Sequence, residues 1–257
     1  MTDRPAEWIV RASPEEAAAA AAERLGAAAR EAVEARGRFA VALSGGSTPG
    51  VLFELLASRA WSGRLPWERT HVFWSDERCV PPDHPDSNYG MAARTLLCHV
   101  PVPAAHVHRI RGEEGAVAAA DTYEEELRGF AGAGAAPLDV VLLGVGTDGH
   151  TASLFPGSEA ERRDAAGTTR RVLPNEAETP GAARVTLTTK AIDEAPVVLF
   201  FVTGAAKSEI VARLARPAAP DGPDADLPAG RIRPAGRLAW ILDAAAAADL
   251  PLDVRVR

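Results

Sequence analysis

The chain contains few cysteines and no apolar run long enough to cross a membrane. Cys79 and Cys98 are the only cysteines among 257 residues, and their spacing matches no metal-binding motif. Two isolated thiols of this kind are typical of proteins in a reducing compartment. The N-terminal residues MTDRPAEW have neither the basic nor the apolar region of a secretory signal peptide. We therefore expect a cytoplasmic protein with two free thiols, no metal and no contact with membranes.

Positive charge is also scarce, because 28 Lys and Arg are outnumbered by 35 Asp and Glu, which gives a formal net charge of −7. This balance argues against a nucleic-acid-binding surface. It still permits a small anionic ligand, which a local cluster of basic side chains can bind. Lys190 and Lys207 are the only lysines. Since arginine fills every other basic position, each lysine either marks a site that needs a compact ammonium group or is an exposed loop residue.

The chain does contain a regular alternation of apolar strand patterns and helical patterns. Hydrophobic residues make up 47% and charged residues 25% of the 257 residues, which is enough for one large α/β domain. Strands are expected at 39–43, 71–74, 106–110, 140–145, 184–187, 197–202 and 239–242, helices at 14–36, 49–59, 90–97, 114–130 and 205–214, and loops at 75–90 and 216–236. This order predicts an α/β fold with a mostly parallel sheet flanked by helices, and we assign residues 1–257 to a single domain.

The most informative segment is LDVVLLGVGTDGHTASLFPGS, at residues 138–158. Its apolar run from Val140 to Val145 is typical of a buried parallel strand, and the run leads into Asp148 and His150. Ligands bind at the carboxyl ends of strands in open α/β sheets, and a histidine can accept a proton near neutral pH. The segment therefore indicates a site of acid–base chemistry, although a histidine with a structural role would fit the same pattern.

The same segment contains a G-x-G-x-x-G pattern from Gly144 to Gly149. A dinucleotide site needs a long helix after the last glycine and an acidic residue at the end of a second strand, about 20 residues further on. Here Pro156 and Gly157 leave room for less than two helical turns, and residues 159–171 show no strand pattern. We therefore expect no nicotinamide cofactor.

A second glycine-rich turn, LSGGSTPG at residues 43–50, joins a predicted strand to a predicted helix. Gly45 and Gly46 leave backbone N–H groups uncovered, Ser47 and Thr48 add hydroxyl donors, and the start of a helix favours an anion. No lysine follows the glycines, which separates this turn from the P-loop. The turn predicts a pocket for one phosphate monoester, unless it is an ordinary connection between strand and helix.

Charged residues follow another strand, in the sequence WSDERCVPP at residues 74–82. The fixed fork of Arg78 suits a carbonyl oxygen or a developing oxyanion. Asp76 and Glu77 either contact a ligand or belong to a solvated turn. The loop beyond them, which includes Asn88, offers hydrogen bonds to sugar hydroxyls.

Two more basic residues stand at strand ends and can supply the positive charge that an anion pocket needs. Lys207 lies one helical turn after Gly204, and Arg184 begins the strand RVTLT. The histidines without a comparable glycine context are expected to be structural: His71, His84, His99, His106 and His108.

Together these segments resemble the 6-phosphogluconolactonases of the widespread bacterial type. LSGGSTP, WSDERCVPPDHPDSNYG, LDVVLLGVGTDGHTASLFPGS, RVTLT and VTGAAK occur in the family's order, from about residue 38 to the final LAWILDAAA. The resemblance implies a modified Rossmann-like α/β fold with a small additional subregion and no bound nucleotide, shared with glucosamine-6-phosphate deaminases.

The resemblance also implies a reaction without a cofactor: hydrolysis of 6-phospho-D-glucono-1,5-lactone to 6-phospho-D-gluconate in the oxidative pentose phosphate pathway. It makes Asp148 and His150 the catalytic pair, with His150 as the base that activates water, and it places Arg78 near the lactone. The substrate-binding residues that it implies are Ser44, Gly45, Gly46, Ser47, Thr48, Asp76, Asn88, Arg184 and Lys207. Of these, the SGGST loop, Arg184 and Lys207 bind the 6-phosphate.

Two alternatives remain from the sequence. The related deaminases follow DGH with I-A-F-N-E-P, whose glutamate serves ring opening, but residues 151–156 read TASLFP and lack that acid. This departure disfavours a sugar-phosphate isomerase or deaminase. A non-catalytic sugar-phosphate sensor would keep the phosphate loop and would not need a base at His150.

Overall fold

A six-stranded sheet forms the centre of the computed structural model, which describes residues 6–132, 136–176, 183–216, 227–251 and 254. The strand order is β1-β9-β8-β5-β2-β3, and every neighbouring pair is parallel. These strands are β1 (Glu7–Arg11), β2 (Phe39–Leu43), β3 (Thr70–Trp74), β5 (Val140–Leu143), β8 (Val197–Val202) and β9 (Arg237–Asp243). The predicted parallel sheet flanked by helices is confirmed, whereas β1 was not expected.

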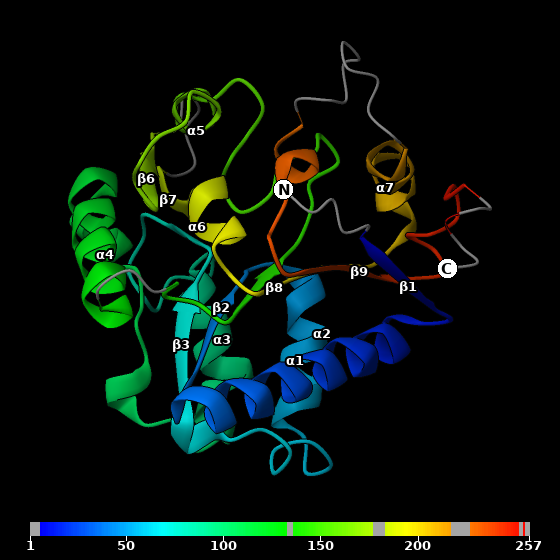
Figure 1. The fold of residues 1–257 in the computed structure, drawn as a ribbon, viewed down its shortest axis with the longest axis horizontal. Coiled ribbons are helices and arrows are strands. Elements are labelled where there is room, and N and C mark those ends of the chain that lie inside the picture. The colour runs from blue at the N-terminus through cyan, green and yellow to red at the C-terminus, as the bar shows by residue number, and fades with distance from the viewer. Residues whose placement is uncertain (1–5, 133–135, 177–182, 217–226, 252–253, 255–257) are drawn as a thin grey trace.

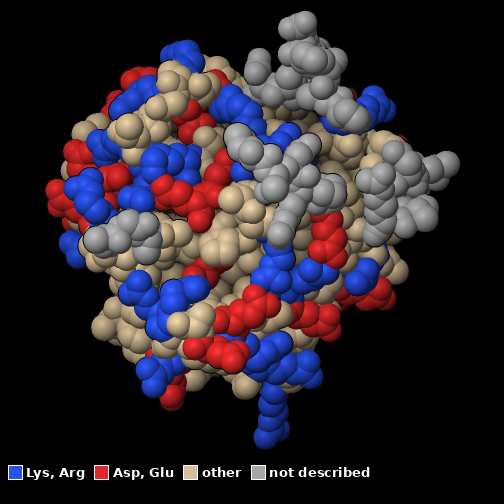
Figure 2. Space-filling model, in the orientation of Figure 1, with Lys and Arg blue, Asp and Glu red and all other residues tan. Residues whose placement is uncertain are grey.

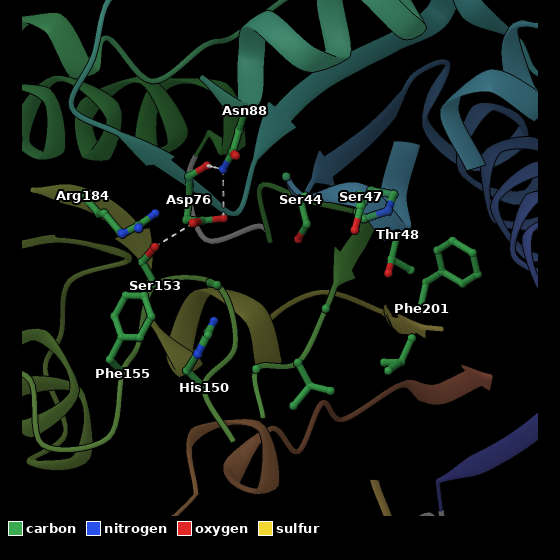
Figure 3. Close-up of a pocket in the computed structure, with 18 of the residues that line it drawn as sticks. Ser44, Ser47, Thr48, Asp76, Asn88, His150, Ser153, Phe155, Arg184 and Phe201 are labelled. Atoms are coloured by element: carbon green, nitrogen blue, oxygen red, sulfur yellow. Dashed lines mark hydrogen bonds between the residues drawn. The ribbon is translucent and has the colours of Figure 1, made fainter. Parts of the chain in front are cut away.

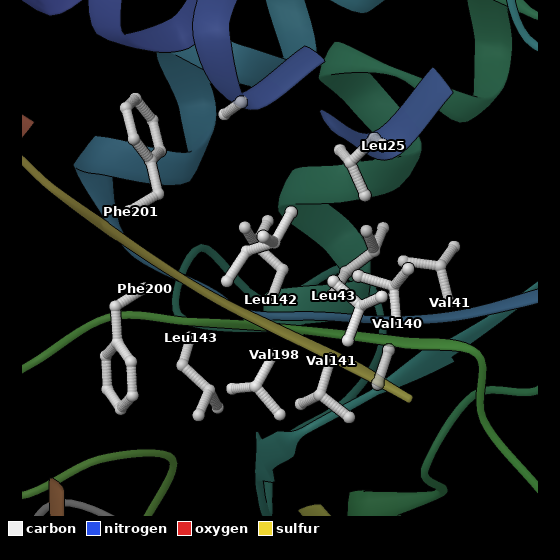
Figure 4. Packing of buried hydrophobic residues seen from close by; sticks show 14 of the residues in the cluster. Leu25, Val41, Leu43, Val140, Val141, Leu142, Leu143, Val198, Phe200 and Phe201 are labelled. Carbon is white, nitrogen blue, oxygen red and sulfur yellow. The ribbon is translucent and has the colours of Figure 1, made fainter. Parts of the chain in front are cut away.

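The central strands are buried on both faces, as their continuous apolar runs predict. Every residue of β5 and of β8 is buried. Consecutive side chains point to opposite faces, so Leu142 and Phe201 lie on one side of the sheet and Leu143 and Phe200 on the other (Figure 4). Helices must therefore cover both faces of the sheet.

The described residues form helices on both sides of the sheet, with α1, α2 and α3 on one side and α5, α6 and α7 on the other (Figure 1). The α-helices are α1 (Pro14–Arg36), α2 (Ser47–Ala57), α3 (Asn88–Thr95), α4 (Ala116–Ala131), α5 (Glu159–Ala165), α6 (Thr189–Asp193) and α7 (Ser208–Ala215). Short 3-10 turns are η1 (Trp67–Arg69), η2 (Leu97–His99), η3 (Ala104–His106), η4 (Gly112–Glu114), η5 (Ala205–Lys207) and η6 (Pro228–Arg231). Helix α1 begins and ends as predicted, because Ser13 Oγ accepts the Glu16 N–H and Gly37 adopts a left-handed φ of 73°.

A second, antiparallel sheet of three short strands makes up the additional subregion. Its order is β4 (Asp76–Arg78), β7 (Arg184–Leu187) and β6 (Val172–Asn175). Strand β4 follows β3 after a single residue, so the charged residues at 76–78 form a strand and not the predicted loop. The sequence does not predict this strand, because Asp and Glu are depleted in strands and its partner, β7, is distant in sequence.

The strand predicted at residues 106–110 is wrong. Only Val107 pairs there, through an isolated parallel bridge to Val72 of β3. His106 stacks on His71 with ring centroids 3.9 Å apart, and His108 approaches His71 Nδ1 to 3.0 Å through its Nε2 atom. This segment is therefore attached to the edge of the sheet by stacked aromatic side chains and by one backbone hydrogen bond, from the His108 N–H to the Val72 carbonyl (2.8 Å), and not by a strand.

The sheet order places a topological switch point between β2 and β5. The chain passes from β2 to its neighbour β3 and then returns to the other side of β2 to form β5, from which β8 and β9 continue outward. Loops that leave the carboxyl ends of two such strands diverge and open a crevice between them. In this protein the crevice lies between the SGGST loop after β2 and the GVGTDGH turn after β5.

The surface carries both signs of charge. Acidic and basic side chains lie side by side over the face seen in Figure 2. Within the described residues, no helix combines the length and the apolar character that crossing a membrane requires. The assignment of residues 1–257 to a single domain stays a prediction.

Candidate active site

A cavity of about 330 Å³ opens at the switch point, at the carboxyl ends of β2, β5 and β8, and the second sheet forms one wall. It is lined by all but one of the residues predicted to act on or bind the substrate: Ser44, Gly45, Gly46, Ser47, Thr48, Asp76, Arg78, Asn88, His150, Arg184 and Lys207. The exception, Asp148, lies directly behind His150. The structure thus brings together side chains from six separate segments of the chain.

His150 stands on a tight turn at the end of β5. The turn is closed by two backbone hydrogen bonds, from Gly149 N–H to the Gly146 carbonyl (3.0 Å) and from Gly146 N–H to the His150 carbonyl (2.8 Å). His150 Nδ1 lies 2.6 Å from Asp148 Oδ1, and the His150 backbone N–H also donates to that oxygen at 3.2 Å. A carboxylate on Nδ1 favours the tautomer with the proton there, which leaves the lone pair of Nε2 free to accept a proton.

The electrostatics of the turn match this arrangement. Burial alone would raise the pKa of Asp148, but attraction to His150 and the hydrogen bonds that it donates hold that pKa below its ordinary value. Asp148 is therefore a carboxylate at neutral pH and remains the acceptor. The His150 ring lies 4.4 Å from the Phe155 ring between centroids, and Figure 3 shows both side chains at the same end of the cavity.

The SGGST loop forms another wall. Its two central positions require glycine for different physical reasons. A Cβ on Gly45 would lie 1.7 Å from Asn88 Oδ1, so the Asn88 carboxamide occupies the place of a side chain. Gly46 is the N-cap of α2 with a φ of 105°, a conformation that L-residues rarely adopt. No side chain caps this helix, so the N–H groups of its first turn are available to donate hydrogen bonds to an anion in the cavity.

Asp76 is the buried centre of a polar network under the cavity. Its carboxylate accepts hydrogen bonds from Ser153 Oγ at 2.6 Å and Ser75 Oγ at 3.2 Å, and it lies 3.4 Å from Asn88 Nδ2 (Figure 3). Ser75 Oγ in turn lies 2.9 Å from Ser44 Oγ. The network joins the ends of β2 and β3 to the loop after β5.

Glu77 points away from the cavity, because successive side chains of a strand face opposite sides. It is only 2% exposed and accepts hydrogen bonds from the backbone N–H groups of Arg78, Asn88 and Tyr89 and from Ser87 Oγ. Burial raises the pKa of Glu77, while the backbone N–H donors oppose that rise. Of the two acids in the SDER motif, Asp76 lines the cavity and Glu77 holds the N-terminus of α3.

Arg78 and Arg184 are direct partners in the antiparallel pairing of β4 with β7. Burial and the charge of Arg78 lower the pKa of Arg184 below its ordinary value. Two like charges opposite each other on a sheet are unfavourable, so an anion placed between them is stabilised. Figure 3 shows Arg184 beside Asp76 and Ser153, whereas Ser47 and Thr48 lie on the other side of Ser44. The residues predicted to bind the phosphate therefore lie on two walls of the cavity and do not form one cluster.

Lys207 reaches the cavity from the turn after β8, where Gly204 adopts a φ of 94°. Within the described residues Lys207 forms no ion pair, whereas Lys190 pairs with Glu194 on α6. The sequence also favours Lys207, because it follows Gly204 at a strand end, and predicts no site role for Lys190.

Ser153 and Phe155 line the cavity and were not predicted as site residues. Both belong to TASLFPG, and the only feature of the sequence that could have identified them as cavity residues is their position just after DGH. Cys79 is half-buried, and burial raises the pKa of its thiol to about 11, which makes it a poor nucleophile. Among the described residues, no group of three or more His, Cys, Asp or Glu side chains is arranged to hold a metal ion.

A Rossmann-like α/β fold with a glycine-rich loop at an uncapped helix N-terminus, a histidine–aspartate pair and paired arginines at its switch point has the features of a protein that binds a small anionic ligand. The model of the family described as glucosamine-6-phosphate isomerases/6-phosphogluconolactonase matches residues 12–240. The chain belongs to this family.

Curated relatives and solved structures similar to this chain include several named 6-phosphogluconolactonases. The chain is 43% identical over 223 residues to the 6-phosphogluconolactonase of Nostoc sp., covering 85% of this chain and 88% of that protein. It is 36% identical over 244 residues to the 6-phosphogluconolactonase of Rattus norvegicus, covering 93% and 91%. The structure of 6-phosphogluconolactonase from Trypanosoma brucei has a TM-score of 0.81 at 29% identity, covering 96% of this chain and 99% of that one. A monomeric glucosamine-6-phosphate deaminase, at 18% identity and a TM-score of 0.76, shares the fold.

Proposed function

We propose that this protein hydrolyses 6-phospho-D-glucono-1,5-lactone to 6-phospho-D-gluconate, a step of the oxidative pentose phosphate pathway. The observation that carries the proposal is His150, held by Asp148 at the cavity between an uncapped helix N-terminus and a pair of arginines. The named 6-phosphogluconolactonases to which the chain is similar support the same reaction. A cytoplasmic location, a sugar phosphate as the small-molecule partner, and no nucleic-acid partner belong to this proposal.

In the proposed mechanism, His150 Nε2 takes a proton from a water molecule as the water oxygen attacks C1 of the lactone. The carbonyl oxygen becomes an oxyanion, which the Arg78 guanidinium stabilises. Collapse of this intermediate breaks the bond between C1 and the ring oxygen. The ring oxygen receives the proton from the His150 imidazolium and becomes the 5-hydroxyl. The new carboxylic acid loses its own proton, so the reaction releases one proton overall.

Binding of the substrate uses the walls that do not take part in proton transfer. The N–H groups and hydroxyls of the SGGST loop, together with Lys207, bind the 6-phosphate, and Arg184 adds positive charge from the facing wall. Asn88 Oδ1 is buried and accepts no hydrogen bond from the described residues, while Asn88 Nδ2 donates to the Asp76 carbonyl at 2.9 Å. These contacts fix the Asn88 side chain against Gly45 in the wall of the cavity. Fixing the non-reacting parts of the substrate holds C1 beside His150.

The test compares two substrates with purified protein. We expect rapid hydrolysis of the phosphorylated lactone, corrected for its spontaneous hydrolysis, and no release of ammonia from glucosamine 6-phosphate. Ammonia release without lactone hydrolysis would identify a deaminase. Binding of 6-phosphogluconate with neither activity would identify a sensor.

A further inference from the structure

The segment at residues 227–233 lies behind the catalytic turn, far from it in sequence. The sequence predicts a surface loop at 216–236, and residues 217–226 lie outside the described residues. The part that follows contributes to the core, because Leu227 is 9%, Ala229 2% and Ile232 0% exposed. In Figure 1 its short helix, drawn in orange, lies beside the green loop that leaves β5.

This segment contacts the catalytic turn at Gly149. The Ala229 N–H donates a hydrogen bond of 3.1 Å to the Gly149 carbonyl. The Leu227 side chain packs on the Gly149 α-carbon so closely that a Cβ there would lie 2.8 Å from Leu227 Cδ2. Gly149 is therefore glycine for two reasons: its φ of 86° and the leucine against it.

The contact fixes the peptide unit next to the base. The Gly149 carbonyl and the His150 N–H belong to the same planar peptide group. Ala229 holds the oxygen side of that plane, and Asp148 Oδ1 holds the nitrogen side at 3.2 Å. With both sides bonded, the plane cannot rotate, and the direction in which the His150 side chain leaves the backbone is set.

The other end of the segment is anchored independently of the turn. Arg231 forms ion pairs with Glu161 and Asp164 of α5, the second at 3.5 Å, and it is less than one-fifth exposed. Asp164 also accepts hydrogen bonds from the Thr189 N–H and hydroxyl at the start of α6, at 2.8 and 3.1 Å. The segment thus links the catalytic turn to α5 and, through Asp164, to α6.

We propose that residues 227–231 are a positioning element for His150, in which Leu227 and Ala229 hold the Gly149–His150 peptide in the orientation that the base requires. The proposal rests on the proposed lactonase function for its kinetic part only. Neither residue touches the cavity, so both act through the turn.

The main test replaces Leu227 with alanine and uses Leu65→Ala as the matched control. Leu65 is 7% exposed, packs near Gly26 of α1, and loses the same atoms. Both variants should lower the melting temperature in thermal unfolding by similar amounts, because each leaves a cavity in the core. We expect Leu227→Ala alone to lower kcat for the lactone about tenfold or more, with KM within about threefold of wild type, because displacing a catalytic group mainly weakens the transition state. Leu227→Met should restore kcat.

A second pair of variants addresses the hydrogen bond. Ala229→Pro removes the N–H donor in the first turn of η6, and Ala229→Gly keeps the donor. We expect the loss of kcat in the proline variant only. This pair decides the proposal if Leu227→Ala does not fold.

A measurement without substrate separates this proposal from the function itself. We expect Leu227→Ala or Ala229→Pro to change the NMR signals of the His150 ring and to raise the pKa of Asp148 toward its ordinary value, because the hydrogen bonds between the two residues loosen. Unchanged signals, or equal losses of kcat in Leu227→Ala and Leu65→Ala, would overturn the positioning role. A wild-type protein that does not hydrolyse the lactone would contradict the function and leave the NMR comparison intact.

Discussion

At the scale of single residues, the site depends on which way neighbouring side chains face. Asp76 and Glu77 are adjacent acids, yet one lies under the cavity and the other binds the N-terminus of α3. His150 is set by its bond to Asp148 and by Phe155 beside its ring. Substitutions at these positions should therefore have separable effects on catalysis and on binding.

His150→Ala should keep the fold and lose most of the activity. The side chain is about one-third exposed, so its removal leaves no large cavity in the core. General-base catalysis contributes roughly 10²–10⁴-fold, and we expect kcat to fall by that factor. Steady-state kinetics with a circular dichroism check on the fold measure this. A folded variant within about threefold of wild type would exclude His150 as the base.

Lys207→Ala and Arg184→Ala should mainly weaken binding of the phosphate. The measurement compares kcat/KM for phosphorylated lactone with that for unphosphorylated gluconolactone. We expect each variant to lose about tenfold or more on the phosphorylated lactone and little on the other, because charge-assisted hydrogen bonds to the phosphate are lost. If Arg184→Ala impairs both lactones equally, Arg184 acts with Arg78 at the lactone and not at the phosphate.

At the scale of elements, the sequence predicts the strands that have apolar runs. It does not predict a strand that forms only because it pairs with a distant segment. The runs at β5 and β8 predict these strands, and Ser13 and Gly37 predict the ends of α1. Strand β4 is charged and only three residues long, so its pairing with β7 leaves no local signal. For the same reason the sequence predicts cavity residues by motif but cannot place Arg184 on a different wall from the SGGST loop.

The attachment of residues 106–108 to β3 should make the protein sensitive to acid. Burial, followed by the charges of His106, His108 and Arg38, lowers the pKa of His71 to about 4, and Glu126 bonds to His108 from α4. The folded state thus favours neutral His71, whose stabilising contribution is complete above a pH of about 6.5 and is lost as the pH falls toward 4.

The variant that tests this is His71→Phe, with exposed His99→Phe as the control. Since His71 is partly exposed, we expect wild type and the control to lose about 1–2 kcal/mol more stability than His71→Phe between pH 7 and pH 5. Urea unfolding at both pH values gives the difference. Equal pH dependence in all three proteins would contradict the assignment.

At the scale of the whole molecule, the switch point between β2 and β5 sets what the fold can bind. The turn after β5 carries the G-x-G-x-x-G pattern, but Phe155 and the short helix α5 follow it in place of a long phosphate-binding helix. The acidic surface is mixed with basic residues over the face of Figure 2. The cavity at the switch point brings together three basic residues, Arg78, Arg184 and Lys207.

Activity should be independent of nucleotides and metals. We expect no calorimetric binding of NAD or NADP at micromolar concentration, because the G-x-G-x-x-G turn holds Asp148 and His150 where a pyrophosphate would need to approach. Exhaustive chelation should leave kcat unchanged. Activity that a chelator abolishes and a metal restores would contradict the mechanism.

The cross-strand pair of Arg78 and Arg184 also has a consequence for how the protein behaves in solution. Two guanidinium groups held together by strand pairing attract whatever anion the buffer offers. An anion that binds only the folded state stabilises it, by about 1.4 kcal/mol at ten times its Kd. Inorganic phosphate or sulfate should therefore raise the melting temperature and compete with the lactone, so the choice of buffer will influence the apparent KM.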